Sequence, residues 1–505
     1  MKNFRYIILI AAVSTLFGCT KQLDQVPVSS VTTTNFYSNA TDFKQGVTGV
    51  YNQLKTYPDF ALWMGEVRSD NVAPLSDGNR DWQGINDFSP NLTTTSFIVS
   101  EWNDMYNGIA NANTVISALN TKGGNIGSDS LRTRYMAECR FLRAFYYFQL
   151  VKSYGKVPLI DTVMTTDQVL TVKQSEPADV YDLIISDLTF AIGNLPKSYT
   201  QADYGRPTTY AAEGLLGLVY MTRSGPTYDI DGPGLNSNEW SKASALFDDI
   251  IASKQYKLLT SFPSVFSYTN ENNAEVLFDV QFSSTSSADF PTELVPIGYW
   301  SGLGLSSYGN GYGSATYNVP PDLLASYKND GNSSVDVRDT FSIQHSWATS
   351  TTSPILDTTD PFIKKYLNVG LRGTSYNNWP VNFIVLRYAD ILLMKAECIL
   401  HGASGSQSDV DTLVNQVRDR AGVSELTNVN MATLMEERRR EFLGEGLRWN
   451  DLVREGMAVT TMNNWISENA YTTINQVVVN YVIYPIPEAE ILVKPGLYNQ
   501  NPGYN

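Results

Sequence analysis

The strongest pattern of apolar and polar positions lies in residues 131–160, LRTRYMAECRFLRAFYYFQLVKSYGKVPLI. Because it has neither Gly nor Pro before Gly155, it predicts one helix of about 23 residues, roughly 34 Å long. Its apolar residues occupy two faces, Ala137, Phe141, Ala144, Phe148 and Val151 on one and Tyr135, Cys139, Leu142, Tyr146 and Leu150 on the other. Two apolar faces are typical of a helix that is covered from both sides, as inside a stack of helix pairs.

Helical periodicity recurs before residue 260 and returns after residue 380. The predicted helices are 35–54, 101–119, 177–195, 206–220, 240–253, 383–400, 409–421 and 431–454. Small residues such as Ala211, Gly214 and Gly217 resemble those that let tetratricopeptide-like helix pairs approach closely, although no strict repeat period is present. The chain is therefore predicted to be mostly α-helical, with a helical-pair scaffold.

Residues 259–380 differ from the rest, because Gly, Ser, Thr, Asn and Tyr dominate there. The run VLFDVQF (276–282) predicts a strand, and 320–327 predicts a short helix. Long loops are predicted at 72–100 and 297–317, and long loops on a rigid scaffold are commonly functional. We divide the chain into a helical region 35–258 and a region 259–505, which is loop-rich over 259–380 and helical over 381–460.

The N-terminal residues predict an export signal. Lys2 and Arg5 precede an apolar run, Tyr6–Phe17. This run is shorter than the about 20 residues needed to span a bilayer. The residues ahead of Cys19 resemble a lipobox, which predicts cleavage before Cys19 and a lipid on its thiol; an ordinary signal peptide with a chance cysteine is the alternative. Residues 1–18 would then be a lipoprotein signal peptide, and residues 19–34 a lipidated tether.

Composition narrows the function classes. The chain has 505 residues, of which 43% are apolar, which allows a large folded core. Its net charge of −15 argues against a nucleic-acid partner. Two histidines, His345 and His401, and three cysteines without a CxxC motif predict neither a disulfide framework nor a zinc site. We expect no metal and no cofactor.

The segment AECRFLRAFYYFQLVKSYGKVPLI resembles the signature helix of the SusD/RagB family, outer-membrane lipoproteins of Bacteroidetes that capture nutrients at the cell surface. The other matching segments are Cys19 with Leu23-Asp24 and Pro27, the Phe36–Tyr51 pattern, Trp102–Asn113, FIVLRYADILLMKAECIL, EERRREFLGEGLRWNDLVR and Tyr484-Pro485-Ile486-Pro487. The resemblance covers nearly the whole mature chain in order, and it implies a SusD-like fold.

Two charged groups could be catalytic or structural. We interpret the run Glu436–Glu441 as intrahelical and interhelical salt bridges, Glu436–Arg440 and Glu437–Arg440 among them, rather than as an anion site. Asp390 and Glu397 share one helix face beside Arg387. A glycosidase needs two carboxylates across a cleft, one with a raised pKa, so pairing with arginine is the interpretation we favour.

No nucleophile elbow, Walker A, H-E-x-x-H or Rossmann motif is present. We therefore predict that the protein is not an enzyme, and a surface glycosidase stays the less favoured alternative.

The aromatic and polar residues of the predicted loops favour sugar binding. In such binding, aromatic rings pack against the apolar faces of a sugar and polar side chains form hydrogen bonds with its hydroxyl groups. The loops at 70–82 and 299–317 offer both kinds of residue. SusD-like proteins that bind starch place aromatic residues on loops from these two regions, so the match is positional. The candidate platforms are Trp82 and Trp300, followed by Tyr299, Tyr308 and Tyr312, with Asn79, Arg80 and Asp81 as polar partners. The alternative is that a loop aromatic packs on the helices beneath it or contacts a transporter.

The resemblance implies a non-catalytic glycan-binding lipoprotein, anchored in the outer membrane and facing the cell exterior. Its implied partner is a SusC-like TonB-dependent transporter, on which it would sit as a lid. A glycan would dock on the loops, the lid would close, and the transporter would import the ligand. The alternative is the same role for peptides or another non-sugar nutrient.

Overall fold

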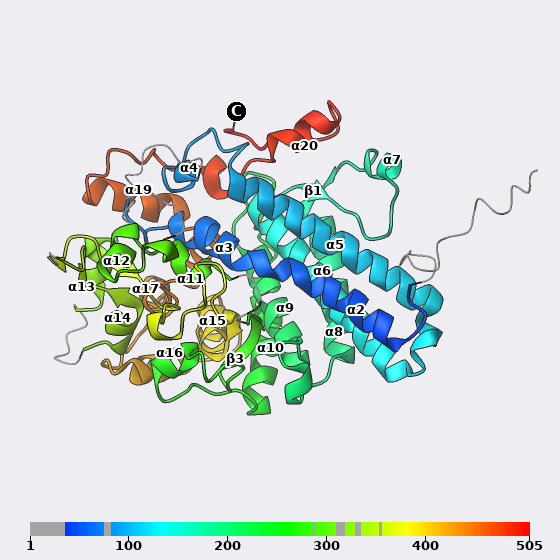
Figure 1. The fold of residues 1–505 in the computed structure, drawn as a ribbon, viewed down its shortest axis with the longest axis horizontal. Helices are drawn as coiled ribbons and strands as arrows, with labels where there is room; N and C mark the ends of the chain where they lie inside the picture. The colour runs from blue at the N-terminus through cyan, green and yellow to red at the C-terminus, as the bar shows by residue number, and fades with distance from the viewer. Residues whose placement is uncertain are drawn as a thin grey trace, which may run out of the picture.

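The long helices pack against one another in chain order, as the apolar pattern predicts. The structure is a computed structural model that describes residues 36–74, 82–283, 285, 288–309, 319–328, 335–352 and 356–504. Successive members of the helix stack are α5 (Ser96–Lys122), α6 (Asp129–Tyr154), α8 (Pro177–Asn194), α9 (Thr209–Ser224), α10 (Trp240–Ser253), α15 (Tyr388–Leu400) and α16 (Gln407–Ala421). Each contacts the next, and α2 (Ala40–Tyr51) lies along both α5 and α6 (Figure 1).

Helix α6 is buried on both faces, which confirms its predicted position inside the stack. All ten residues of its two apolar faces are at most 3% exposed. On the α8 side, the Arg143 guanidinium donates to both carboxylate oxygens of Asp187, at 2.7 and 2.9 Å; on the α5 side, it donates to Asn113 Oδ1 at 2.7 Å. The helix ends at Gly155, whose φ of +70° is in the region that favours glycine.

Shorter helices surround the stack. They are α3 (Tyr57–Ala61), α4 (Gln83–Asn86), α7 (Thr166–Val169), α11 (Phe290–Glu293), α12 (Ile297–Gly302), α13 (Pro321–Ser326), α14 (Val337–Ser342), α17 (Met431–Glu441), α18 (Arg448–Arg454), α19 (Ala458–Glu468) and α20 (Glu488–Val493). Two expectations change here. The predicted loop 72–100 contains α4 and the start of α5, and the predicted helix 431–454 is broken between α17 and α18, where Gly444 and Gly446 have positive φ.

The described strands form two-stranded antiparallel pairs. The pairs are β1 (Val157–Pro158) with β2 (Gln174–Ser175), β3 (Val276–Val280) with β8 (Phe383–Arg387), β4 (Ile343–Gln344) with β7 (Phe362–Ile363), and β5 (Trp347–Ala348) with β6 (Leu356–Asp357). Strand β3 confirms the predicted strand at 276–282. Residues 383–387, predicted as helix, are instead a strand, because their apolar run pairs with β3.

One hydrophobic core extends through the described residues on both sides of position 258, from Tyr37 to Tyr504. Buried polar contacts also join distant segments, since the Glu66 carboxylate accepts from the Gly444 N–H at 2.7 Å and the Gly446 N–H at 3.0 Å. The division at 258 stays a prediction about sequence regions. Among the helices in the described part of the chain, none is both long and apolar enough to cross a membrane.

Candidate functional site

Trp63 links the end of the first loop predicted to bind a ligand to the helix that precedes the second. The Trp82 ring lies 4.5 Å from the Trp63 ring, measured between centroids. The Trp63 indole N–H in turn donates to the Glu293 carboxylate at 2.8 Å, and Glu293 ends α11, just ahead of α12. In Figure 1, α4 lies at the upper left and α12 at the left.

Trp82 and Trp300 are buried side chains and are not exposed platforms. Trp82 is 2% exposed and Trp300 is fully buried, so neither ring presents a face to solvent. The Trp300 ring is packed between Tyr308, at 5.9 Å, and Trp379, at 6.0 Å. Large aromatic rings gain most free energy when such neighbours cover them, which corrects the platform interpretation for both tryptophans. Contact of either ring with a ligand stays a prediction.

Tyr299 and Tyr308 are partly exposed, and both rings lie next to that of Trp300, at 5.5 and 5.9 Å between centroids. The Tyr308 hydroxyl donates to the Gly373 carbonyl at 2.8 Å, and the exposed Arg372 guanidinium lies 5.4 Å from the centre of the Tyr308 ring. We call Tyr299, Tyr308 and Arg372 the tyrosine surface. It combines aromatic rings with a hydrogen-bond donor, which is the combination that a sugar requires.

The sequence analysis missed Arg372 and Trp379. The segment from 371 to 379 joins this site because Ala288 N–H donates to the Asn377 carbonyl at 2.9 Å and Trp379 N–H donates to the Ala288 carbonyl at 3.1 Å. The available signal was the cluster Tyr376-Asn377-Asn378-Trp379 in the loop-rich region. The other predicted site residues, Asn79, Arg80, Asp81 and Tyr312, lie outside the described residues.

Asp70 fixes the start of the first candidate loop to the scaffold. Its carboxylate accepts two hydrogen bonds of 2.8 Å from the Arg448 guanidinium of α18, and the Arg439 guanidinium of α17 lies 3.4 Å away. Burial by itself raises the pKa of Asp70, but the two guanidinium groups outweigh burial and lower this pKa to about 2. The ionised form of Asp70 is therefore the one that the fold stabilises.

The salt bridges of Asp70 are expected to weaken in acid. An unfolded Asp has a pKa of about 3.9, above the folded value of about 2. Their contribution is therefore present above about pH 5 and is lost as the pH falls through the folded pKa. We expect the loss of unfolding free energy caused by Asp70→Asn to be about 1 kcal/mol smaller at pH 3 than at pH 7. Urea unfolding at both pH values measures this; equal losses would contradict it. Asp129→Asn, at an exposed position, is the control.

The charged run at 436–441 is structural, as predicted. Glu437 contacts the guanidinium groups of Arg338 and Arg418 at 2.6 Å and that of Arg440 at 2.8 Å. The predicted pairing of Glu437 with Arg440 is thus confirmed. Within the described residues, Glu436 pairs with Arg439 and Arg448 instead of Arg440. This corrects the other predicted pair.

Asp390 and Glu397 also pair with arginines, which confirms the favoured interpretation. Asp390 accepts from Arg438 at 2.7 Å, and Glu397 accepts two bonds from Arg454, at 2.6 and 2.8 Å. Burial raises the pKa of both carboxyls and the arginines oppose it. Both carboxylates are buried, so they do not flank a cleft in which a glycosidic bond could be cleaved.

Within the described residues, no group of three or more His, Cys, Asp or Glu side chains could hold a metal ion. Cys139 and Cys398 are buried free thiols.

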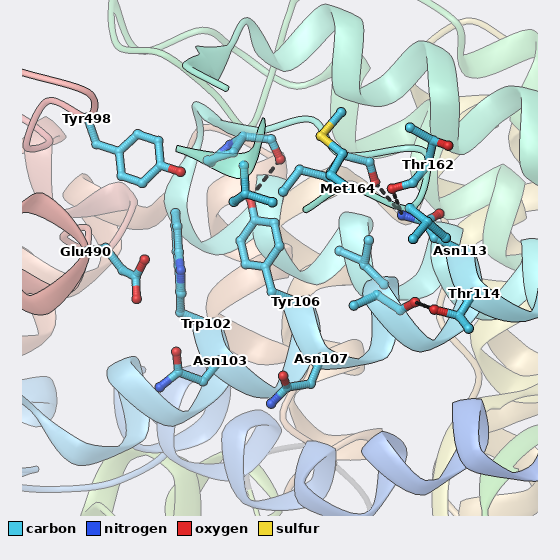
Figure 2. A pocket seen from close by; sticks show the side chains of 16 residues that line it. Trp102, Asn103, Tyr106, Asn107, Asn113, Thr114, Thr162, Met164, Glu490 and Tyr498 are labelled. Carbon is cyan, nitrogen blue, oxygen red and sulfur yellow. Dashed lines mark hydrogen bonds between the residues drawn. The ribbon is translucent and has the colours of Figure 1, made fainter. Parts of the chain in front are cut away.

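A pocket that the sequence analysis did not foresee lies beside α5. It has a volume of about 530 Å³ and is bounded by α5, residues 158–169 and residues 490–498. Figure 2 shows Trp102, Tyr106 and Tyr498 around it, with the amides of Asn103 and Asn107 at its edge. We call it the α5 pocket. Its size is within the range of about 300–1,000 Å³ that is usual for small-molecule sites.

Two family models match this chain. The model of the SusD family matches residues 336–504, and the model described as "Starch-binding associating with outer membrane" matches residues 21–221. The chain belongs to the SusD/RagB family. These two matches include all three of the motifs in α6, β8–α15 and α17–α18 on which the resemblance chiefly rested.

Relatives within the SusD/RagB family align over the whole chain. SusD-like protein P25 of Formosa agariphila is 24% identical over 558 aligned positions, which cover 100% of both chains. A solved laminarin binding SusD-like protein has a TM-score of 0.73 at 26% identity, over 93% of this chain and 100% of that one. Surface glycan-binding protein A from Bacteroides thetaiotaomicron, in complex with laminarihexaose, has a TM-score of 0.75 at 24% identity, over 92% and 100% of the two chains.

The SusD/RagB motifs of this chain lie in its scaffold. The Arg438 guanidinium of α17 donates to Asp390 of α15 at 2.7 Å and to Asp451 of α18 at 2.8 Å. The motif in α6 forms the two buried faces described above. These motifs therefore identify the family through its packing, whereas ligand specificity has to come from the loops and pockets.

Proposed function

We propose that this SusD/RagB protein is a non-catalytic glycan-binding lipoprotein of the outer membrane. Two observations support the proposal. Solved relatives of the same fold are named as laminarin and glycan binding proteins, and this chain presents the tyrosine surface, whose two rings belong to the second loop predicted to bind a ligand. The tyrosine surface is the observation on which the proposal chiefly depends.

The chemistry of the tyrosine surface suits a sugar. The Tyr308 ring has its hydroxyl bonded to Gly373, which fixes the orientation of the ring. A sugar ring can lay its C–H face on such an aromatic face, while the Arg372 guanidinium donates to its hydroxyls. The buried layer of Trp300 and Trp379 beneath keeps the surface rigid, so binding would cost little ordering entropy.

The finer parts of the proposal concern location and delivery. The protein would be held by a lipid on Cys19, would face the cell exterior, and would pass its ligand to a SusC-like TonB-dependent transporter. The family description, which associates these proteins with the outer membrane, supports this location. The long polar segment after Cys19 would serve as the tether.

Removal of the Tyr308 ring is expected to weaken glycan binding. In calorimetry of the chain from residue 20 with a panel of polysaccharides, Tyr308→Ala should lower affinity for the bound glycan at least tenfold, about 1.4 kcal/mol. Tyr308→Phe keeps the ring and should retain most of the affinity. Tyr204→Ala removes a tyrosine that is 52% exposed elsewhere, and should change nothing.

Other results of this panel have distinct meanings. Binding of peptides but of no polysaccharide would replace the glycan with a peptide ligand. Hydrolysis of a glycan by the purified protein would contradict the non-catalytic proposal. Full glycan affinity in Tyr308→Ala would place the site away from the tyrosine surface.

A further inference from the structure

We propose that the α5 pocket is a second ligand site, and that it takes a short neutral saccharide. The inference goes beyond the proposed function, because the pocket is separate from the tyrosine surface. The pocket is lined by residues of α5 and of the segments that contain α7 and α20. In Figure 1, α20 lies at the top and α7 at the upper right, whereas α12 lies at the left.

The walls of the α5 pocket are fixed by hydrogen bonds within the protein. The Tyr106 hydroxyl donates to the Pro158 carbonyl at 2.8 Å, and the Asn113 side-chain amide donates to the Ile160 carbonyl, also at 2.8 Å (Figure 2). On the far side, the Lys494 ammonium donates to the Leu170 carbonyl at 2.7 Å. These bonds hold three segments of the chain in place, so the pocket exists before a ligand enters and binding needs little reorganisation.

The lining places one partly exposed aromatic ring, that of Tyr106, beside polar groups that can still form hydrogen bonds. The Trp102 and Tyr106 rings lie 5.0 Å apart between centroids, and Trp102 is 3% exposed, so Tyr106 is the ring of this pair that reaches the pocket. Asn103 and Asn107, one helical turn apart, are exposed at the pocket edge, and their side-chain amides form no hydrogen bond with the described residues.

A saccharide matches this division of the pocket into an apolar and a polar part. An amide both donates and accepts, as a sugar hydroxyl does, so Asn103 and Asn107 can each pair with hydroxyl groups. The C–H face of the sugar would lie against the apolar part of the lining, to which Ile160, Val163 and Met164 contribute.

The charge of the lining selects a neutral ligand. Among the described residues that line the pocket, Glu490 is the acidic one, and none is Lys, Arg or His. Lys494, on the far side, is not one of these lining residues and donates to the Leu170 carbonyl. The carboxylate or sulfate of an acidic sugar would enter beside Glu490 without a cation in the lining to pair with it. Desolvation of such an unpaired anion opposes binding, so we expect neutral oligosaccharides to bind and uronic-acid oligomers to be rejected.

Filling the pocket tests the inference directly. Ala110 lines the pocket from an exposed position on α5, so Ala110→Trp should occupy the cavity without disturbing the core. Asn120→Trp is the matched control, because Asn120 is exposed on α5 but does not line the pocket. Calorimetry would use the full mature chain in a sugar-free detergent, with laminarihexaose and maltohexaose as neutral probes and trigalacturonate as the acidic probe.

The expected result is two saccharide sites in the wild type. Ala110→Trp should lose one of them, with at least a tenfold drop in its affinity, and Asn120→Trp should keep both. The double variant Tyr299→Ala/Tyr308→Ala should lose the other site and keep the pocket. Equal thermal midpoints of the two Trp variants would show that Ala110→Trp is folded.

The outcomes separate this inference from the proposed function. If Ala110→Trp binds as the wild type does while the tyrosine double variant loses all binding, the pocket inference fails and the proposed function stands. If trigalacturonate binds and Ala110→Trp abolishes its binding, the neutral class is overturned. If no saccharide binds the wild type, the inference and the proposed function both fail.

Discussion

Replacing Arg387 with alanine is expected to lower the free energy of unfolding by about 3–5 kcal/mol. Arg387 is 1% exposed and ends β8, at the point where that strand joins α15. Its guanidinium donates to both carboxylate oxygens of Glu445, at 2.8 and 2.9 Å, and to carboxylate oxygens of Glu441 at 2.6 Å and Glu275 at 3.0 Å. Without the Arg387 cation, the buried carboxylates of Glu445, Glu441 and Glu275 have too few positive partners. The free energy needed to remove these carboxylates from water is then no longer offset by ion pairing.

Denaturant unfolding of Arg387→Ala and Arg387→Lys measures this effect. Lysine keeps the charge but cannot reproduce the forked donor geometry, so Arg387→Lys should fall between the alanine variant and the wild type. Arg372→Ala removes an exposed arginine and should change stability by no more than about 0.5 kcal/mol. If Arg387→Ala were as stable as the wild type, the hydrogen bonds between Arg387 and its three glutamates would contribute nothing to stability.

Replacing Cys19 with alanine is expected to convert the protein from a membrane-bound to a water-soluble form. Lipid chains on the Cys19 thiol would hold the protein at the bilayer, since each buried CH₂ group contributes about 0.8 kcal/mol. Cys19 itself lies outside the described residues. The wild type should therefore partition into the detergent phase of a Triton X-114 extraction. Cys19→Ala, exported with a cleavable non-lipoprotein signal in place of residues 1–18 so that no apolar run remains, should partition into the aqueous phase.

Detergent partition tests for the attached lipid independently of any binding to a transporter, because it is measured on solubilised protein. Thr20→Ala changes the neighbouring residue while keeping the cysteine, and should stay in the detergent phase. Partition of Cys19→Ala into the detergent phase would exclude Cys19 as the anchor.

Most of the helical scaffold could be predicted because its helices repeat the same local pattern. The two faces of α6 could be predicted from the apolar residues between Ala137 and Leu150, because other helices cover both faces and both are therefore apolar. The strand at 383–387 was not readable. A short apolar run fits either a helix or a strand, and what decides it is β3, which lies more than a hundred residues earlier in the chain.

The candidate site was harder to predict, because exposure depends on neighbours from distant segments. The sequence showed that Trp82 and Trp300 are large apolar side chains in long predicted loops, but their burial depends on the neighbouring rings of Trp63 and Trp379. The α5 pocket is likewise assembled from three segments, the last of them more than three hundred residues after the others. The spacing of residues within any one of these segments does not predict such a cavity.

The stacking of Tyr308 on Trp300 provides a built-in optical reporter. The two rings lie 5.9 Å apart with 29° between their planes, and the indole is fully buried beneath the partly exposed phenol. A ligand that settles on Tyr308 changes the electronic surroundings of Trp300 without touching it. Intrinsic tryptophan emission can therefore follow titrations at the tyrosine surface without a label, and Trp300→Phe identifies the part of the signal that comes from this ring.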